Sequence, residues 1–218
     1  MLSETKHLAI FGASGRTGQH LVAQALQRGY EVTALGRSAQ KLAAYEGRIE
    51  IVEGDVKHAE AVARAVARAD AVISVLGPTA NRPDYAVTRG TENILEAMKE
   101  HGVRRLVVSA GAGVADPNDE PKLLNKLISV LLKLFSRHVY EDMKRMVETV
   151  RRSDVDWTIV RVPMLTGEAT EVMTTKGVRV GYVGKGMGAR LSRANLAGFM
   201  LDQLRDETYL HKAPAISD

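Results

Sequence analysis

Short runs of apolar and β-branched residues alternate with longer amphipathic segments through the first half of the chain. The runs span residues 7–11, 31–35, 49–52, 71–75 and 105–108, and their length is typical of buried strands. The segments at 17–28, 59–67 and 87–101 repeat their apolar positions with the period of an α-helix. Strands that alternate with helices in this way predict βαβ units with right-handed crossovers, and therefore a parallel sheet with helices on both faces.

The alternation is interrupted at 115–121, where the sequence ADPNDEP is typical of a loop. Helices are expected after it at 121–135 and 138–152, strands at 157–160 and 178–183, and a closing helix at 192–204 with Ser192 as its N-cap. No repeat or linker divides the chain. The prediction is an α/β protein with a doubly wound parallel sheet, folded as one domain over residues 1–218, with a helical lid insertion at about 115–152.

The helix expected at 121–135 is rich in leucine and basic, with Lys122, Lys126 and Lys133 followed by Arg137. An amphipathic helix in a globular chain usually covers a core, which favours a lid over the substrate cleft. A subunit interface and peripheral attachment to an acidic membrane are the two alternatives.

The sequence GASGRTG, residues 12–18, lies directly between the first predicted strand and the first predicted helix. Gly12 allows a tight turn, Gly15 lets the backbone approach a pyrophosphate, and Gly18 lets the helix lie close to the strand. The N-terminus of the helix then offers unpaired N–H groups and the positive end of its dipole to phosphates. In this strand-turn-helix context the motif predicts a Rossmann-type dinucleotide-binding turn.

The end of the second predicted strand indicates which dinucleotide binds. A domain of this kind that binds NAD usually has a carboxylate there, which binds the ribose hydroxyls. Here Arg37 and Ser38 follow the strand and Lys41 comes shortly after. Arg37 can form two parallel hydrogen bonds with a 2′-phosphate, and Arg16 can approach it from the glycine-rich turn. The sequence therefore predicts NADP(H) rather than NAD(H); the alternative is that Arg37 and Lys41 are only solvated surface cations.

Composition excludes several other classes of function. Hydrophobic residues make up 45% of the chain and charged residues 26%, as in an ordinary globular protein. Because cysteine is absent, disulfides, cysteine nucleophiles and cysteine zinc sites are excluded, in keeping with a cytoplasmic location. The six histidines show no metal-ligand spacing, so no metal is expected.

The net charge and the hydropathy of the chain limit the classes of partner that it is expected to bind. The net charge of +4 is spread along the chain, which suits an anionic small molecule and does not indicate nucleic acid. No apolar run approaches the roughly 20 residues that span a bilayer, and no signal peptide is visible. We expect a monomer or a small homo-oligomer that acts on a small-molecule substrate.

Several separate blocks resemble the atypical short-chain dehydrogenase/reductases. They are FGASGRTG at 11–18, VEGDV at 52–56, VISVLG at 72–77, the segment from 90 to 113 that ends in VVSAGAG, DWTIVRVP at 156–163, and the final helix. The sequence is most similar to the branch of NAD(P)H-binding proteins that are like flavin reductase and biliverdin reductase B, to which the NmrA-like group is related. The resemblance implies a strand order of 3-2-1-4-5-6-7, with the cofactor across the carboxyl ends of the strands.

The resemblance also implies positions along the cofactor. It places Ser14, Arg16 and Thr17 at the phosphates, Asp55 and Val56 beside the adenine, Leu76 and Gly77 at the central ribose, Ser109 at the nicotinamide ribose, and Pro163 and Met164 beside the nicotinamide ring. Two positions depart from the biliverdin reductase B branch, because Gly111 and Leu165 stand where that branch has serine and histidine. The substrate chemistry of that branch is therefore not implied.

The predicted helix at 138–152 contains a second candidate motif. Tyr140 and Lys144 have the YxxxK spacing of short-chain dehydrogenases, in which the lysine holds the ribose and lowers the pKa of the tyrosine, so that the phenol can act as acid or base. Ser109 would be the third catalytic residue. The alternative is a helix-surface tyrosine beside an ordinary cation, because this spacing also arises by chance.

Three functional hypotheses follow. The leading one is an NADPH-dependent oxidoreductase that transfers a hydride to a small conjugated acceptor, such as a flavin, a quinone or a tetrapyrrole-like compound, between Ser109 and the Pro163–Met164 turn. Transfer to a flavin needs little acid-base help from the protein, because the ring itself is the acceptor. The alternatives are a non-catalytic NADP(H)-binding redox sensor of the NmrA type, and a carbonyl reductase or epimerase that depends on Tyr140 and Lys144.

Overall fold

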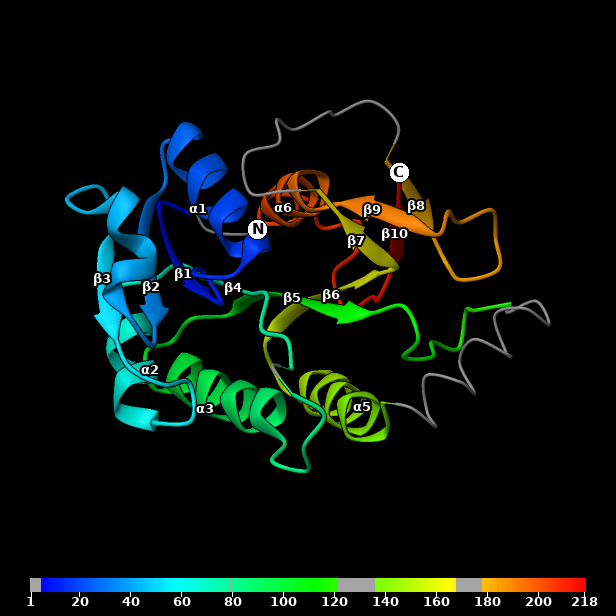
Figure 1. Ribbon diagram of the computed structural model, residues 1–218, viewed down its shortest axis with the longest axis horizontal. Helices are drawn as coiled ribbons and strands as arrows, with labels where there is room; N and C mark the ends of the chain where they lie inside the picture. Colours follow the sequence, from blue (N-terminus) through cyan, green and yellow to red (C-terminus); the bar gives the residue numbers. More distant parts are fainter. Residues whose placement is uncertain (1–4, 79, 121–135, 168–177) are drawn as a thin grey trace.

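The computed structural model describes residues 5–78, 80–120, 136–167 and 178–218, and it has one large sheet between two layers of helices (Figure 1). The strands lie in the order β3-β2-β1-β4-β5-β6-β10-β8. Their bounds are β1 His7–Phe11, β2 Glu31–Gly36, β3 Glu50–Glu53, β4 Ala71–Ser74, β5 Arg105–Gly111, β6 Asp156–Val162, β8 Arg179–Gly181 and β10 Ala215–Ser217. All neighbouring pairs are parallel except β10 and β8, which are antiparallel.

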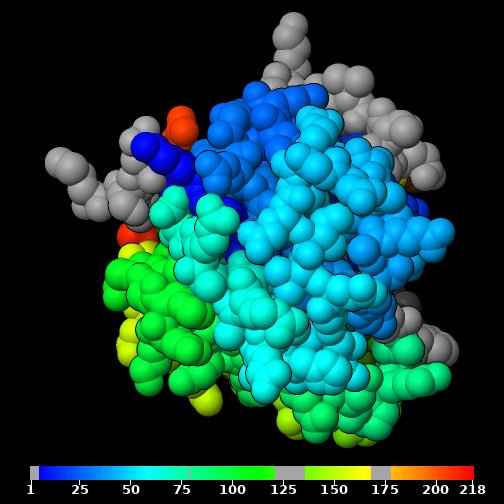
Figure 2. All heavy atoms as spheres, turned by 90° about the vertical axis from the view of Figure 1, so that its left-hand side faces the viewer, coloured from blue at the N-terminus to red at the C-terminus, as the bar shows by residue number. Residues whose placement is uncertain are grey.

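Helices cover both faces of this sheet, which confirms the doubly wound α/β prediction (Figure 1). Helices α1 (Arg16–Gln27) and α6 (Arg193–Asp202) contact each other on one face. Helices α2 (Ala59–Val66), α3 (Ala86–Glu100) and α5 (Arg137–Arg151) lie side by side on the other. A 3-10 helix, η1 (Ala39–Tyr45), follows β2. Figure 2 looks at the β3 edge, where the N-terminal part of the chain, in blue and cyan, covers most of the visible face.

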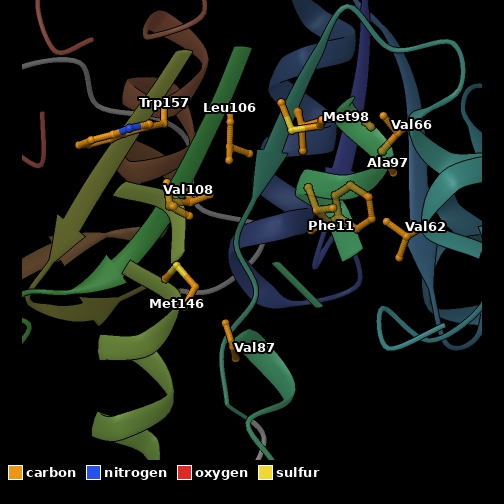
Figure 3. Packing of buried hydrophobic residues seen from close by; sticks show 14 of the residues in the cluster. Phe11, Val62, Val66, Val87, Ala97, Met98, Leu106, Val108, Met146 and Trp157 are labelled. Carbon is orange, nitrogen blue, oxygen red and sulfur yellow. The ribbon is translucent and has the colours of Figure 1, made fainter. Parts of the chain in front are cut away.

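The central strands are apolar at successive positions because both of their faces are buried. In β1, Leu8 and Ile10 face the cluster under α1 and α6, whereas Ala9 and Phe11 face the cluster under α2, α3 and α5. Figure 3 shows the second cluster, in which Phe11, Val62 and Met98 lie at one end and Trp157 and Met146 at the other. This continuous run of apolar positions was the signal from which the strands were predicted.

Helix α5 is part of the helical layer. Its buried residues Met143, Met146, Val147 and Val150 belong to the same apolar cluster as the sheet, and the helix lies along α3. The helix expected at 121–135, with its alternatives as lid, interface or membrane contact, lies outside the described residues.

The C-terminal part of the chain differs from the prediction. The chain does not close with the helix at 192–204, because β10 follows it and inserts between β6 and β8. The strand expected at 178–183 was to be the seventh in the sheet, beside β6. It forms β8 at the edge of the sheet instead, and β10 lies beside β6. Two further short strands, β7 (Met164–Thr166) and β9 (Arg190–Ser192), form a small parallel sheet of their own.

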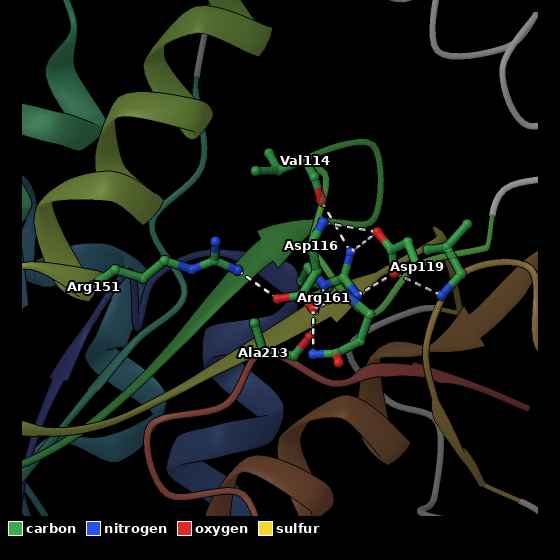
Figure 4. A network of polar contacts seen from close by, with 8 residues as sticks. Val114, Asp116, Asp119, Arg151, Arg161 and Ala213 are labelled. Atoms are coloured by element: carbon green, nitrogen blue, oxygen red, sulfur yellow. Dashed lines mark hydrogen bonds and ion pairs between the residues drawn. The ribbon is translucent and has the colours of Figure 1, made fainter.

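A buried ion pair holds the loop that follows β5 (Figure 4). The guanidinium of Arg161, which is fully buried in β6, donates to both carboxylate oxygens of Asp119 at 2.7 Å and to the carbonyls of Val114 and Ala213. Asp119 also accepts from the N–H of Val183. One arginine thereby joins the loop at 114–119, strand β6 and the approach to β10.

The charge state of Asp119 follows from these contacts. Burial alone would raise the pKa of this carboxyl, but the hydrogen bonds from Arg161 and from the N–H of Asp116 outweigh burial and hold its pKa below the usual value. A second ion pair, Arg151 with Asp116, ties the same loop to the end of α5.

Candidate cofactor-binding site

The turn between β1 and α1 can be built only with glycine at two positions. Gly12 has a φ of +84°, and a Cβ there would lie 2.9 Å from the carbonyl oxygen of Val75, the residue that follows β4. A Cβ on Gly18 would lie 2.1 Å from the carbonyl oxygen of Gly12 and 2.5 Å from the Cα of Ala13. The first glycine therefore permits the turn, and the second lets α1 approach the turn closely.

The N-terminus of α1 lacks a side-chain cap. Gly15 is its N-cap residue, no side chain among the described residues accepts a hydrogen bond from its first N–H groups, and the first turn carries no acidic residue. Gly15 itself has a φ of −80°, and the nearest atom to a Cβ there would be the carbonyl oxygen of Gly12 at 3.2 Å. The free N–H groups and the positive end of the helix dipole therefore face outward, as a phosphate-binding turn requires.

The N-termini of α3 and α5 are instead capped by each other's chain segments. Asp142 of α5 is buried and accepts hydrogen bonds from the N–H groups of Val87 (3.1 Å) and Thr88 (2.9 Å) in α3. Asn81, in the loop before α3, accepts from the N–H groups of His138 (3.1 Å) and Val139 (3.4 Å) in α5. We call this arrangement the reciprocal cap. It satisfies N–H groups at both helix starts, which sets them apart from α1.

Three exposed cations lie at the edge where β1 and β2 end. Phe11 is the partner of Leu35, so the glycine-rich turn and the β2–η1 connection leave the sheet at the same edge. Arg16, Arg37 and Lys41 extend from these two segments, and within the described part of the chain none of their side chains forms an ion pair or a hydrogen bond. Unpaired cations at this place leave positive charge available for the phosphates of a dinucleotide.

Two of the residues predicted at the adenine end of the cofactor form hydrogen bonds within the protein. Ser38 is the N-cap residue of η1, without a side-chain cap, next to Arg37. Asp55, after β3, accepts a hydrogen bond from the N–H of Lys57 at 2.9 Å, and the carbonyl of Val56 accepts from Asn93 of α3 at 2.9 Å. Asp55 and Val56 are thus held at the same edge, because β3 runs parallel to β2.

The candidates for the nicotinamide end follow β4, β5 and β6. Leu76 and Gly77 come after β4, Ser109 lies near the end of β5 opposite Val160, and Pro163 and Met164 come directly after β6. The carboxyl ends of these parallel strands meet at one edge of the sheet, as expected from the sequence. The hydroxyl of Ser109 is half-buried and has no hydrogen-bond partner among the described residues. Met164 is 58% exposed, more than any other large apolar side chain described.

Tyr140 and Lys144 have different surroundings. Tyr140 is half-buried in the first turn of α5, whose start is hydrogen-bonded to Asn81 in the connection that follows β4. The ammonium of Lys144 is 3.6 Å from the carboxylate of Glu148 in the same helix, and its side chain is 55% exposed. Because Glu148 follows Lys144 by one helical turn, the lysine lies in a solvated helical ion pair.

Sequence reasoning did not single out four residues that position this edge: Asn81, Asp119, Asp142 and Arg161. Asp142 lies beside Met143 and one turn before Met146 on the buried side of an amphipathic helix. A carboxylate in such a position was the available signal, because a buried charge requires partners. Among the described residues no group of three or more histidine or acidic residues could hold a metal ion, and no described helix is long and apolar enough to cross a membrane.

Comparisons with known proteins identify the family of this chain. The sequence signature of the NAD(P)H-binding family matches residues 12–207. The chain is 34% identical over 106 residues to the uncharacterized protein YwnB of Bacillus subtilis, an alignment that covers 49% of this chain and 47% of YwnB. It is 28% identical over 130 residues to cinnamoyl-CoA reductase 1 of Oryza sativa subsp. japonica, covering 54% of this chain and 38% of that enzyme. The alignments therefore span less than half of these relatives.

Solved structures share the fold at low sequence identity. A short-chain dehydrogenase/reductase from Veillonella parvula in complex with NADP superposes with a TM-score of 0.80 at 19% identity, covering 98% of this chain and 95% of that one. The anaerobilin reductase ChuY of Escherichia coli O157:H7 superposes with a TM-score of 0.77 at 17% identity, covering 97% of both chains. The family signature spans the glycine-rich turn and nearly all the strands described above, and the chain belongs to the NAD(P)H-binding family.

Proposed function

We propose that this protein is an NADPH-dependent reductase that transfers a hydride to a small conjugated acceptor, such as a flavin, a quinone or a tetrapyrrole-like compound. The observation that carries the proposal is the composition of the sheet edge where the carboxyl ends of the parallel strands meet. Among the described residues, this edge has a helix start without a side-chain cap and three cations without a partner at one end, and a serine hydroxyl without a partner and an exposed methionine at the other. The helix start and the cations suit the phosphates of the cofactor. The serine and the methionine suit the nicotinamide ring and a flat acceptor stacked on it.

In this proposal, different residues bind different parts of the cofactor. The N–H groups at the start of α1, with Ser14, Arg16 and Thr17, bind the pyrophosphate, and Arg37, Ser38 and Lys41 bind the 2′-phosphate. Asp55 and Val56 border the adenine, and Leu76 and Gly77 border the central ribose. Ser109 donates a hydrogen bond at the nicotinamide ribose, while Pro163 and Met164 exclude water from one side of the ring.

Bound NADPH would supply the hydride in this reaction. An acceptor that carries its own electrophilic ring needs no catalytic acid from the chain, because the accompanying proton can come from water. This agrees with the ion pair between Lys144 and Glu148, which occupies the lysine that a tyrosine-dependent mechanism would place on the ribose. Tyr140 lies in the first turn of α5 near the same edge, so a tyrosine-dependent carbonyl reductase is the second candidate.

The activity is tested by mixing the protein with NADPH and flavin mononucleotide, riboflavin or a small quinone, and following the loss of NADPH absorbance. We expect turnover with at least one acceptor, and we expect Tyr140→Phe to retain it within about twofold. A tyrosine-dependent enzyme would lose about 100-fold or more, because general acid-base catalysis contributes on that scale. Tight NADPH binding without turnover on any acceptor would contradict the proposal and favour the redox sensor.

The cofactor preference is tested by Arg37→Gln. We expect this variant to bind NADPH about tenfold more weakly and NADH with unchanged affinity, since only NADPH carries the phosphate that the guanidinium would bind. The matched control is Arg48→Gln, which removes another exposed arginine just beyond the far end of η1. Equilibrium titration with both cofactors measures the effect. Equal weakening of both cofactors, or of neither, would show that Arg37 does not bind a 2′-phosphate.

A further inference from the structure

The small sheet of β7 and β9 has one buried face and one outward face. Leu165 and Leu191 are partners in its register and both contact the apolar cluster under α1 and α6, where Leu191 is fully buried. Met164 and Arg190 are the preceding pair, and both side chains are exposed. Because side chains alternate along a strand and partners share a face, Met164 and Arg190 lie side by side on the outward face, about 4.8 Å apart in the backbone.

Arg190 differs from the other cations of this region. In the described segment at 178–193, Arg179 donates to the carbonyl oxygens of Gly186 and Asp218, Lys185 pairs with Glu120, and Arg193 donates to the carbonyl oxygen of Gly167. The side chain of Arg190 has no partner among the described residues.

Asp218 is hydrogen-bonded to the backbone of Arg190, but its carboxylate binds other groups. The N–H of Asp218 donates to the Arg190 carbonyl at 3.0 Å. Its carboxylate accepts from the N–H of Ser192 and from the side-chain amide of Asn195, both at 2.7 Å. The backbone of Arg190 is thus fixed by β9 and Asp218, while none of the described residues binds its guanidinium.

We infer that Arg190 forms an anion subsite beside Met164, so that the preferred acceptor is a flat conjugated ring that carries a phosphate or carboxylate group. The ring would contact the thioether of Met164, and the guanidinium would bind the anionic group through charge-assisted hydrogen bonds. This inference rests on the proposed function, because it assumes that the acceptor binds next to the Pro163–Met164 turn.

Matched pairs of acceptors test the subsite. Flavin mononucleotide and riboflavin differ only in a phosphate, and biliverdin and its dimethyl ester differ in two carboxylates. Equilibrium binding of each to the NADP⁺-loaded protein is measured by fluorescence quenching, with NADPH oxidation as a second readout. We expect the wild type to bind the anionic member of at least one pair about tenfold more tightly, a difference typical of one charge-assisted contact. The pair that shows the difference distinguishes a phosphate from a carboxylate ligand.

Arg190→Gln should remove that difference by weakening only the anionic member, with the neutral member unchanged. Arg152→Gln, which removes an exposed arginine at the C-terminus of α5, is the control and should leave the ratio as in the wild type. A wild type without preference, or a preference that survives Arg190→Gln, would overturn the subsite even if the protein reduces its acceptors. A ratio that depends on Arg190 without any turnover would support the subsite and refute the reductase activity.

Discussion

Gly18→Ala is expected to lower the free energy of unfolding by about 3 kcal/mol, the upper part of the usual range for overpacking. The added Cβ would lie 2.1 Å from the carbonyl oxygen of Gly12 and 2.5 Å from the Cα of Ala13. Both obstacles are backbone atoms of a turn that β4 holds from the other side, so α1 would have to move away from β1. Urea unfolding monitored by circular dichroism measures the loss, and cofactor affinity should fall with it.

Gly15→Ala separates cofactor binding from stability. Gly15 has an ordinary φ of −80°, and its Cβ would meet only the Gly12 carbonyl oxygen, at 3.2 Å. We expect its free energy of unfolding to change by less than about 1 kcal/mol, while NADPH binds at least about tenfold more weakly, because the new methyl group faces the phosphates. Equal loss of stability in both variants, or undiminished affinity in Gly15→Ala, would contradict the roles assigned to the two glycines.

Arg161→Met is expected to destabilise the protein by about 3–5 kcal/mol at neutral pH, since it leaves a buried carboxylate without its cation. Asp119 has a side chain only 8% exposed, and among the described residues it would keep only the N–H donors of Asp116 and Val183. The control is Arg104→Gln, which breaks an ion pair with Asp156 in which the arginine side chain is 65% exposed. That surface pair should contribute less than about 1 kcal/mol.

The same variant should have a smaller effect in acid. The folded-state pKa of Asp119 is below its ordinary value of 3.8, so its contribution to stability is present above about pH 4 and is lost as the pH falls through the folded-state pKa. The difference between wild type and Arg161→Met, measured by urea unfolding, should therefore shrink between about pH 7 and about pH 3. A difference that stays constant over this range would mean that the carboxylate charge of Asp119 does not stabilise the fold.

The sequence predicted the elements whose pattern is dictated by burial on two faces. β1 and β4 are apolar at every position but one, and α3 repeats its apolar residues over four turns, so both types of element were recognisable without a structure. The role of the glycine-rich turn could be predicted because each of its three glycines is required there for a different steric reason. Two of these reasons, at Gly12 and Gly18, are confirmed by the space around each glycine.

The elements that were missed are short or depend on distant partners. β7, β9 and β10 have three residues each, too few for a period to be visible, and their pairing joins segments far apart in the sequence. Arg161 lies between Val160 and Val162 in β6, and nothing near it in the sequence identifies Asp119 as its partner. The site residues could be placed along the sheet edge from strand order alone, whereas the lack of a side-chain partner for Arg37 and Arg190 among the described residues could be found only from the folded structure.

The reciprocal cap has a consequence for how this part of the molecule opens. Asn81 can cap α5 only while the loop before α3 is in place, and Asp142 can cap α3 only while the first two turns of α5 are wound. Unwinding either helix start therefore exposes the backbone amides of the other. We expect the amide hydrogens of both starts to exchange with solvent in a single local unfolding event. The connection after β4, which includes Leu76 and Gly77, is thereby coupled to the helix that bears Tyr140.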